Sequence, residues 1–417
     1  MHQSLQVKIL HELMQQLDEG RNIDAGVQYR MPTSAYVCPE IAAREWDQFF
    51  QNHPQLIGLS DDLPKPGSYL TTEDFGTPIL ATRDKDGTFH AFLNACRHRS
   101  VKVANTPRGQ KSVFMCPFHN WSYANTGELL TIPNEEHFGA VDKSCNGLIE
   151  LPAVERGGLL WVHPQPDGRL DIDELLGDLA DEIGSFNLGA LKATGDKTID
   201  MQLNWKFAND TFGETYHFGK LHKDTLGRLY YGNNLHLQEF GRHHRFVTAN
   251  RGIDALRTQP ESEWRITHGT FVLYYLFPNI QLVVNSDSVS LIKIYPDPKN
   301  PSRSITRIGF YFEPEIAAAI LGAPDTASNA THRPAAEVYN YEGRSADDPA
   351  TRLANSLEVF RSTIELEDYV MGEMQQLAAA DGTLKEIQFG RNEPALHHFH
   401  TNYRGALGMS PLEEIQP

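Results

Sequence analysis

Hydrophobic positions near the start of the chain recur at the spacing of a helix. Leu5, Ile9, Leu13 and Leu17 alternate with glutamine, glutamate and aspartate, and a period near 3.6 residues places them on one face. Gly20 is a candidate end of this helix. The polar residues between the apolar positions differ from the uninterrupted apolar core of a signal peptide. We therefore predict an amphipathic helix.

The pattern changes to short β-like runs between Pro54 and His163. Turn residues separate these runs, and Asp86-Gly87 is a strong signal for a tight turn. This part of the chain predicts a small all-β domain. Residues 165–195 are acidic and helix-like, which indicates a helical connection to the next domain.

The second half of the chain predicts a different architecture. A helical pattern runs from Asn204 towards His222, β-rich runs lie between residues 270 and 313, and a long helical stretch covers about 351–380. An antiparallel sheet wrapped round a long helix is the simplest α+β arrangement of these parts.

Length, charge and composition exclude several classes of protein and of binding partner. A chain of 417 residues exceeds what one core usually supports. The formal net charge of -17 argues against nucleic acid and anionic membranes as partners. There is no apolar run of about 18 residues, so we expect no membrane span.

The four cysteines, Cys38, Cys96, Cys116 and Cys145, are too few for a disulfide scaffold. This usage fits a reducing compartment, and we expect a cytoplasmic protein. Cys38 and Cys145 are interpreted as inert, buried thiols.

The other two cysteines belong to a candidate metal site. Cys96 is followed by His98, and Cys116 is followed by His119. Two thiolates and two imidazoles are the ligands of a [2Fe-2S] cluster with two histidines on one iron. They also suit a structural zinc ion, and four unrelated core residues are a third possibility. The residues alone leave these three interpretations open.

A second polar cluster lies among aromatic residues. In a continuous helix, Asp210, Glu214 and His217 share one face by their spacing. His222 is rotated by about 140° from His217 in such a helix, and Gly219 gives the backbone freedom to bend. Ordinary core or surface histidines are the alternative.

A mononuclear iron held by two histidines usually also takes a carboxylate ligand. Glu367 and Asp368 both fall within or beside the buried arc of the late helix, whereas Glu365 points further away. Periodicity alone does not choose between Glu367 and Asp368.

Both clusters resemble motifs of one family. The pattern C-x-H…C-P-x-H-x-W, completed by Trp121, resembles the Rieske signature. The pattern N-W-K…D/E-x-x-H-x-x-x-x-H resembles the mononuclear-iron motif of Rieske non-haem iron oxygenase large subunits. The resemblance implies an α+β protein, with an all-β Rieske [2Fe-2S] domain and a helix-grip (START-like) catalytic domain built from an antiparallel sheet and a long C-terminal helix. The resemblance also implies three parts along the chain. These are an N-terminal helical segment (1–53) that packs on the catalytic domain, a Rieske domain (54–165) and the catalytic domain (166–417).

The resemblance also implies roles for individual residues. Asp368 precedes Glu373 by five residues and Gln376 by eight, as the ligand aspartate of the family does. The implied cluster ligands are Cys96, His98, Cys116 and His119, and the implied iron ligands are His217, His222 and Asp368. Glu214 is then the electron bridge between subunits, Asp210 a further catalytic residue, and Phe207, Thr211 and Phe212 candidate pocket residues.

Three positions depart from the family pattern. Asn120 stands where glycine is usual, and asparagine tolerates a positive φ. Glu214 stands where aspartate is usual, as in some branches that include oxygenases of quaternary amines. Thr211 replaces a common asparagine, which leaves hydrogen bonding near the substrate open.

The implied function is that of a terminal oxygenase. It would use O2 and a mononuclear non-haem Fe(II) to hydroxylate a small aromatic or apolar substrate. Electrons would come from NAD(P)H through a separate reductase or ferredoxin, because the sequence has no nucleotide fingerprint. The family also implies a homotrimer, with or without a small beta subunit.

The alternatives to this function are a monooxygenase that hydroxylates or demethylates an amine or quaternary ammonium substrate, a Rieske electron-transfer protein, and a helix-grip ligand-binding protein with a structural zinc.

Two further groups of residues stand apart from these candidate ligands. Arg97, Arg99, Lys102, Arg108 and Lys111 form a basic stretch, which is either a solvated loop or a docking patch for an acidic electron donor. No role is expected for a group of histidines that we place on solvated loops or helix faces: His243, His244, His397, His398 and His400.

Overall fold

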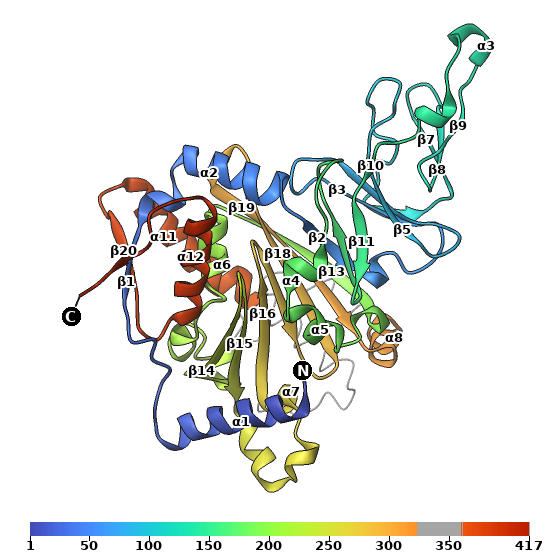
Figure 1. The fold of residues 1–417 in the computed structure, drawn as a ribbon. Helices are drawn as coiled ribbons and strands as arrows, with labels where there is room; N and C mark the ends of the chain where they lie inside the picture. The colour runs from blue at the N-terminus through green and yellow to red at the C-terminus, as the bar shows by residue number, and fades with distance from the viewer. Residues whose placement is uncertain (323–359, 361, 417) are drawn as a thin grey trace. The chain divides into compact units, whose positions relative to one another are not determined.

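The computed structural model describes residues 1–322, 360 and 362–416, and they form two compact units (Figure 1). The larger unit consists of Met1–Ala43, Leu176–Leu179 and Lys192–Pro417. The smaller unit consists of Arg44–Leu175 and Ala180–Leu191.

An antiparallel seven-stranded sheet is the centre of the larger unit, within its described residues, and it confirms the predicted α+β class. Strands β16 to β18 are rich in valine, isoleucine, leucine and tyrosine and are buried on both faces, as expected for the middle of a covered sheet. In spatial order the strands are β13 (Lys192–Met201), β19 (Asn300–Phe312), β18 (Ser288–Asp297), β17 (Ile280–Val284), β16 (Thr270–Leu276), β15 (His243–Asn250) and β14 (Tyr230–Phe240).

Helices pack against this sheet. Helix α6 contacts β18, β19 and α11, and α12 contacts β14 and β15 (Figure 1). The sequence did not predict α12, and residues 351–359 of the predicted late helix lie outside the described part. The helices of this unit include α1 (Gln3–Asp18), α6 (Trp205–Asp210), α7 (Ile266–Gly269), α8 (Pro314–Gly322), α11 (Tyr369–Asp381) and α12 (Pro394–Ala406).

The predicted N-terminal helix is confirmed as α1. It buries Ile9, Leu10, Leu13 and Met14 along one face, which agrees with the apolar spacing in the sequence. Gly20 follows the helix with a positive φ of 59°, a conformation that favours glycine. Among the described residues, no helix combines the length and the apolar character needed to cross a membrane.

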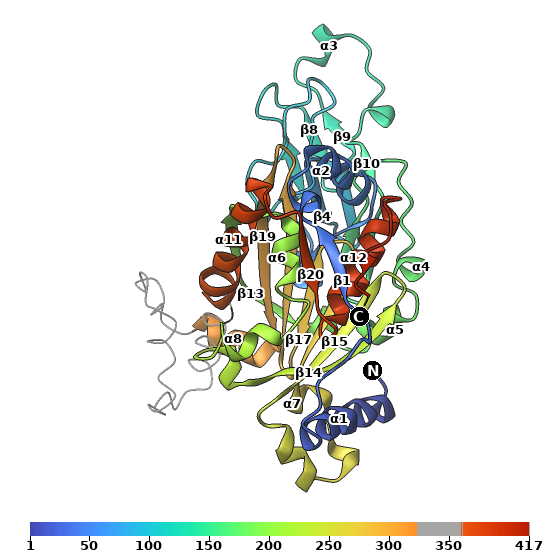
Figure 2. The same cartoon turned by 90° about the vertical axis from the view of Figure 1, so that its left-hand side faces the viewer.

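A small sheet joins distant parts of the larger unit. Strand β1 (Tyr29–Pro32) pairs antiparallel with β20 (Glu386–Phe389) on one side and with β21 (Glu413–Glu414) on the other. Figure 2 shows β1 and β20 side by side with α12 close by. Residues from both ends of the sequence therefore meet beside α12.

The smaller unit confirms the predicted all-β domain. Gly87 has a φ of 85° in the turn between β4 and β5, as the Asp-Gly pair predicts. The acidic segment after it forms the short helices α4 (Ile172–Leu176) and α5 (Leu179–Gly184). The described strands form three sheets: β10 (Glu150–Leu151), β5 (Phe89–Leu93), β4 (Ile79–Arg83), β3 (Ser68–Thr72) and β6 (Arg108–Gln110); β11 (Ala153–Arg156), β12 (Leu159–Val162) and β2 (Gln55–Leu59); and β7 (Val113–Met115), β8 (Ser122–Ala124) and β9 (Leu129–Thr131).

Candidate metal centres and an acidic cavity

The chain leaves the helical conformation directly after α6. Gly213 N donates to Asp210 O, three residues back, at 2.9 Å, and such tight turns end an α-helix. Glu214 follows in an irregular segment and His217 in the short helix η6 (Tyr216–Gly219). The prediction that Asp210, Glu214 and His217 share the face of one helix is therefore wrong.

The loop nevertheless brings the predicted iron ligands together. The ligand atoms of His217, His222 and Asp368 all lie within 4.8 Å of one another. The two Nε2 atoms are 3.0 Å apart, and Asp368 Oδ1 lies 3.0 Å from Nε2 of His222 and 3.4 Å from Nε2 of His217. Two imidazoles and one carboxylate form a facial set that suits ferrous iron and leaves positions open. The residues present therefore fit a mononuclear iron.

Each histidine is held from behind by a carboxylate. Nδ1 of His217 donates to Glu214, whose other oxygen accepts the backbone N–H of His217 at 3.1 Å. Nδ1 of His222 donates to Glu367 at 2.6 Å, and Thr225 donates to the same oxygen at 2.9 Å. A carboxylate on Nδ1 sets the tautomer that leaves Nε2 free to bind a metal. Glu367, which periodicity alone could not separate from Asp368, thus orients a ligand in this geometry.

These acid–base contacts shift the histidine pKa values. Burial opposes the charged imidazolium, but hydrogen bonds and charges from Asp368 and Glu214 outweigh it and raise the pKa of His217 to about 10. The pKa of His222 is also raised: burial lowers it, and Asp368 and Glu367 raise it by more. The carboxylates around the two histidines therefore stabilise positive charge at this site. Either a proton or a metal ion can supply that charge.

The cluster residues converge at one end of the smaller unit. Cys96 and Cys116 are buried, and the rings of His98 and His119 lie 4.6 Å apart between centroids. Ser100 N donates to Cys96 O, and Asn120 N donates to Cys116 O, so each Cys-His pair lies on a tight turn. Asn120 has the positive φ of 58° that its place in the motif predicts.

The donor atoms of this site fit an iron–sulfur cluster. Nδ1 of His98 is buried without a hydrogen-bond partner among the described residues, which is costly unless a metal binds it. Burial, and then the proximity of Cys96, raises the pKa of Cys116, so iron would have to stabilise the thiolate form. Tyr123 OH lies 3.2 Å from Cys96 Sγ, where it can donate to a coordinated sulfur.

The remaining cysteines differ from expectation. Cys145 is exposed at the end of the short 3₁₀ helix Lys143–Cys145, and Cys38 is only half-buried. Cys38 Sγ instead contacts Glu40 Oε2 at 3.0 Å. The prediction that Cys38 and Cys145 are buried is therefore wrong.

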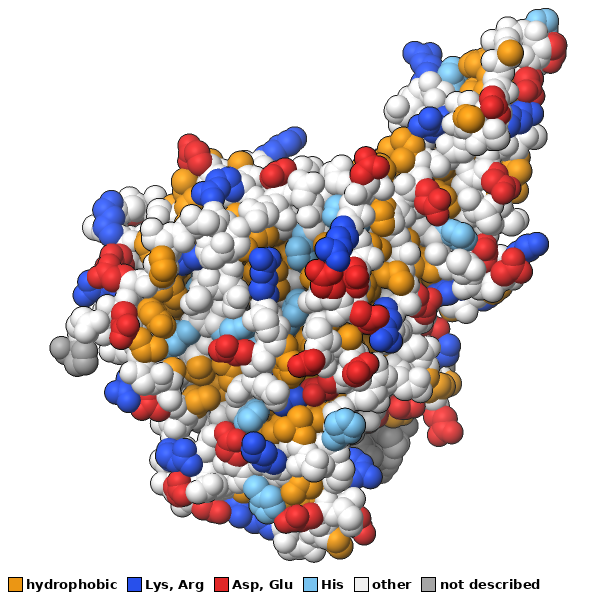
Figure 3. Space-filling model, in the orientation of Figure 1, with side chains coloured by type: hydrophobic (Ala, Val, Ile, Leu, Met, Phe, Trp, Pro, Cys, Tyr) orange, Lys and Arg blue, Asp and Glu red, His pale blue; other side chains and the backbone are white. Residues whose placement is uncertain are grey.

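Part of the basic stretch is neutralised within the smaller unit. Lys102 pairs with Glu73, and Arg108 pairs with Asp62. Arg99 instead lies over the ring of the exposed Phe118, 5.1 Å from its centroid. Figure 3 shows basic and hydrophobic side chains close together at the end of the unit that carries α3 (Glu135–Phe138).

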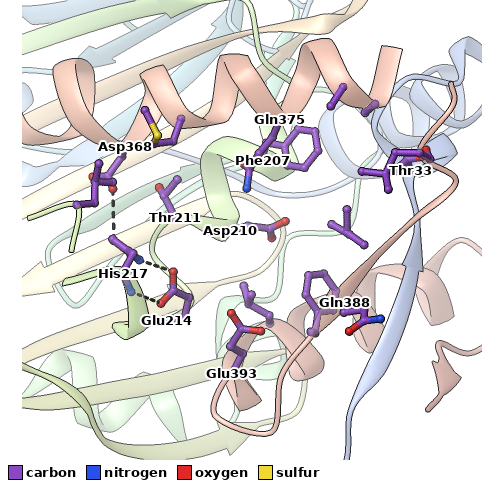
Figure 4. Close-up of a pocket in the computed structure, with 18 of the residues that line it drawn as sticks. Thr33, Phe207, Asp210, Thr211, Glu214, His217, Asp368, Gln375, Gln388 and Glu393 are labelled. Atoms are coloured by element: carbon purple, nitrogen blue, oxygen red, sulfur yellow. Dashed lines mark hydrogen bonds and ion pairs between the residues drawn. The ribbon is translucent and has the colours of Figure 1, made fainter. Parts of the chain in front are cut away.

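An acidic cavity of about 610 Å³ adjoins the candidate iron site (Figure 4). His217 and Asp368 form part of its wall, as do the predicted pocket residues Phe207 and Thr211 but not Phe212. Lys220 is the only lysine or arginine among its described lining residues. The lining contains four carboxylates, Asp210, Glu214, Asp368 and Glu393, and apolar residues that include Met371, Leu384, Ile387, Phe389 and Leu396.

Asp210 is held at the edge of this cavity by two buried residues. Tyr36 OH donates to Oδ2 and His400 Nε2 to Oδ1, both at 2.9 Å. Tyr36 lies 174 residues and His400 190 residues from Asp210 in sequence, so no local pattern could reveal these contacts. Glu393 was missed for the same reason.

The extra histidines are buried rather than solvated, which corrects the prediction. Nδ1 of His244 lies 3.0 Å from Nδ1 of His398, whose Nε2 donates to Gly241 O at 2.9 Å. His398 Nδ1 must therefore accept, and His244 Nδ1 donates. The sheet and α12 cover all of them: His243, His244, His397, His398 and His400.

Because His244 and His398 are buried, we expect the free energy of unfolding to fall at acidic pH. Burial, and then the nearby His398 and His243, holds the pKa of His244 well below 6.5, and burial also lowers the pKa of His398. The His244 ring is thus neutral in the fold and takes up a proton on unfolding below about pH 6.5. This uptake should lower the free energy of unfolding by up to about 1.4 kcal/mol per pH unit below that value. We expect His244→Asn, which keeps a donor, to reduce the pH dependence of denaturant unfolding between about pH 6.5 and about pH 5.5; an unchanged slope would contradict this.

Two family models match the chain, one in each of the two units. The family model "Ring hydroxylating alpha subunit (catalytic domain)" matches residues 188–408, and the model "Rieske [2Fe-2S] domain" matches residues 53–150. The structure of the quaternary ammonium Rieske monooxygenase CntA is similar to 93% of the chain, with a TM-score of 0.73 and 18% identity, over 97% of its own length. Naphthalene 1,2-dioxygenase reaches a TM-score of 0.67 at 16% identity, over 93% of this chain and 94% of its own.

Curated relatives match over shorter spans. The glycine betaine monooxygenase oxygenase subunit of Chromohalobacter salexigens is 30% identical over 46% of this chain and 43% of its own length. The large oxygenase component of the 2,4-dinitrotoluene dioxygenase system of a Burkholderia species is 34% identical over 44% of this chain and 40% of its own. The matched part is therefore less than half of these relatives. Because the catalytic-domain model covers more than half of the 417 residues, the chain belongs to the ring-hydroxylating alpha subunit family, with a Rieske [2Fe-2S] domain ahead of the catalytic domain.

Proposed function

We propose that the protein is the terminal oxygenase component of a multicomponent Rieske oxygenase. The observation that carries this proposal is the convergence of His217, His222 and Asp368 in a chain that also holds two cysteines and two histidines at a cluster site. When bound, the [2Fe-2S] cluster supplies single electrons and the Fe(II) supplies a place for O2 beside the substrate.

The protein's own residues prepare the iron site. Glu214 and Glu367 fix the two imidazole rings through Nδ1, so both Nε2 lone pairs face Asp368. His222 and Asp368 are buried, which restricts water around the ligands and strengthens their electrostatic interactions. These residues orient the ligands and leave one side of the site available.

Metal and sulfide analysis of protein purified without oxygen tests this function. We expect about three irons and about two acid-labile sulfides per chain, together with the absorption of an iron–sulfur cluster. A Rieske electron-transfer protein would lack the third iron. A colourless protein that binds zinc and contains no sulfide would instead be a helix-grip ligand-binding protein.

Electron delivery is proposed to involve a separate reductase or ferredoxin and a homotrimer, with or without a small beta subunit. Glu214 has 15% of its side chain exposed while it holds His217, so a second protein surface can reach it through the cavity. In this proposal Glu214 connects His217 to a cluster histidine of a neighbouring copy. The native mass of the holoprotein tests the trimer, and an active monomer would contradict it.

The first candidate substrate is a small aromatic or otherwise apolar molecule. A specific observation supports a second candidate, an amine that is hydroxylated or demethylated. The bridging position holds Glu214 rather than aspartate, and the similar proteins include glycine betaine monooxygenase and an N,N-dimethyl phenylurea N-demethylase. Turnover of a mixed panel with a reductase, read by mass spectrometry, separates the two classes.

A further inference from the structure

The three candidate iron ligands come from two segments that are far apart in the sequence. His217 and His222 lie in the loop after α6, whereas Asp368 lies directly before α11. Metal–ligand distances tolerate a change of only about 0.2 Å, so other contacts must hold the two segments at a fixed spacing. Helices α6 and α11 lie side by side (Figure 2), and the contacts between them are candidates for this role.

The side chain of Gln376 joins α11 to the start of α6. Gln376 is 3% exposed, and its Oε1 accepts from the backbone N–H of Asn204 at 2.8 Å. Asn204 is the N-cap of α6, and its side chain accepts from Lys206 N at 3.0 Å. Gln376 Nε2 donates to Ser302 Oγ on β19 at 2.9 Å. One buried amide therefore binds both the central sheet and the helix that leads to the two histidines.

Two further residues of α11 add to this attachment. Glu373 Oε1 accepts the backbone N–H of Gln202 at 2.9 Å. Gly372 lies against Leu203 so closely that a Cβ atom on the glycine would be 2.5 Å from Leu203 Cδ1. Residues 202–204, directly before α6, thus contact three residues on one side of α11.

A separate hydrogen bond holds the beginning of α11. Tyr369 OH lies 2.8 Å from Thr306 Oγ1 on β19, and both side chains are buried. Tyr369 and Gln376 are seven residues apart, which places them on one face of the helix. Two attachments fix the direction of a helix, whereas a helix with one attachment can tilt about it. Asp368 follows such a tilt because it adjoins Tyr369.

We propose that Gln376, together with Glu373, is a positioning residue for the single iron. It fixes the direction of α11 relative to α6 and so places Asp368 opposite the two histidines. This inference rests on the proposed function, which requires an iron at these ligands. Gln376 lies eight residues after Asp368, about 12 Å along the helix, so it acts through the helix and not as a ligand.

The Fe(II) dissociation constant of the single-iron site tests this role. Fe(II) is titrated without oxygen into chelator-treated, full-length protein that keeps its cluster. Gln376→Met has a similar volume but lacks the amide, and it should raise the constant by about 10- to 100-fold, the range for groups that orient a metal ligand. Gln376→Glu keeps an acceptor for Asn204 N, and Ser302 Oγ can donate to it, so this variant should recover most of the affinity. Glu373→Ala, at a half-exposed position, should give a smaller rise.

Gln16→Met is the matched control. Gln16 is 4% exposed and joins α1 to β14, where its Oε1 accepts from Leu235 N at 3.1 Å and its Nε2 donates to Leu235 O at 3.0 Å. This variant should lower the free energy of unfolding by an amount similar to that of Gln376→Met, but it should leave the iron affinity unchanged. With nitric oxide as a probe, the electron paramagnetic resonance spectrum of the ferrous site should change in Gln376→Met and not in Gln16→Met.

Three results would count against the inference. A Gln376→Met protein that binds iron as tightly as the wild type, or a Gln16→Met protein that loses affinity equally, would overturn it and leave the proposed function intact. Glu373→Ala carries the test if Gln376→Met does not fold, and an unchanged constant in that variant would also overturn the inference. A wild type that binds no single iron would instead overturn the proposed function and this inference together.

Discussion

Replacing Asp368 with alanine should remove the mononuclear iron and reduce substrate turnover to background, while the cluster stays in place. Asp368 is the buried carboxylate that faces both histidine Nε2 atoms. Two imidazoles alone bind iron weakly and supply no negative charge. Iron quantification, the visible spectrum of the cluster and turnover with a reductase measure the effect.

A matched pair of variants separates this loss from general damage. Asp381→Ala removes an exposed carboxylate at the end of α11 and should retain all iron. Glu367→Gln should lower iron affinity by about 10- to 100-fold, the range for groups that orient a metal ligand. Full occupancy in Asp368→Ala would show that this residue is not a ligand.

Replacing Glu214 with glutamine should slow re-oxidation of the reduced cluster by about 10- to 100-fold, with both metals present. The carboxylate contacts Nδ1 and the backbone N–H of His217, and its remaining exposure faces the cavity. An amide offers one acceptor where the carboxylate offers two, so it cannot hold His217 and accept from a second histidine equally well. Stopped-flow absorbance during a single turnover measures the rate.

Glu214→Asp provides the comparison for this experiment. It keeps the charge but shortens the side chain, so we expect a rate between those of the wild type and Glu214→Gln. Iron content must be equal in the three proteins for the rates to be compared. A Glu214→Gln variant that transfers electrons at the normal rate would exclude the bridge.

The residues proposed for the cluster lie on two local turns, so a local pattern in the sequence could single them out. Cys96 with His98, and Cys116 with His119, are each close in sequence, and even the positive φ of Asn120 followed from residue type. His217, His222 and Asp368, which were proposed as iron ligands, also lie close together in the structure. Their backbone was not predicted, since periodicity treats Asp210 to His217 as one helix and does not register the tight turn at Gly213.

Contacts between distant segments account for what the local patterns left open or misplaced. Periodicity did not choose between Glu367 and Asp368, and the structure places Glu367 at Nδ1 of His222 and Asp368 at its Nε2. His400 was assigned to a solvated surface because a pattern of neighbouring histidines carries no information about α12, which places it against Asp210. Tertiary packing of this kind overrides local propensity.

The position of β1 bears on the order in which the two metal centres are loaded. This strand requires partners near residues 386 and 413, so the larger unit is complete only after nearly all of the described chain has left the ribosome. The smaller unit is almost continuous between residues 44 and 175, and its hairpins are local, which favours early folding. We therefore expect nascent chains to acquire the iron–sulfur cluster first and the single iron last.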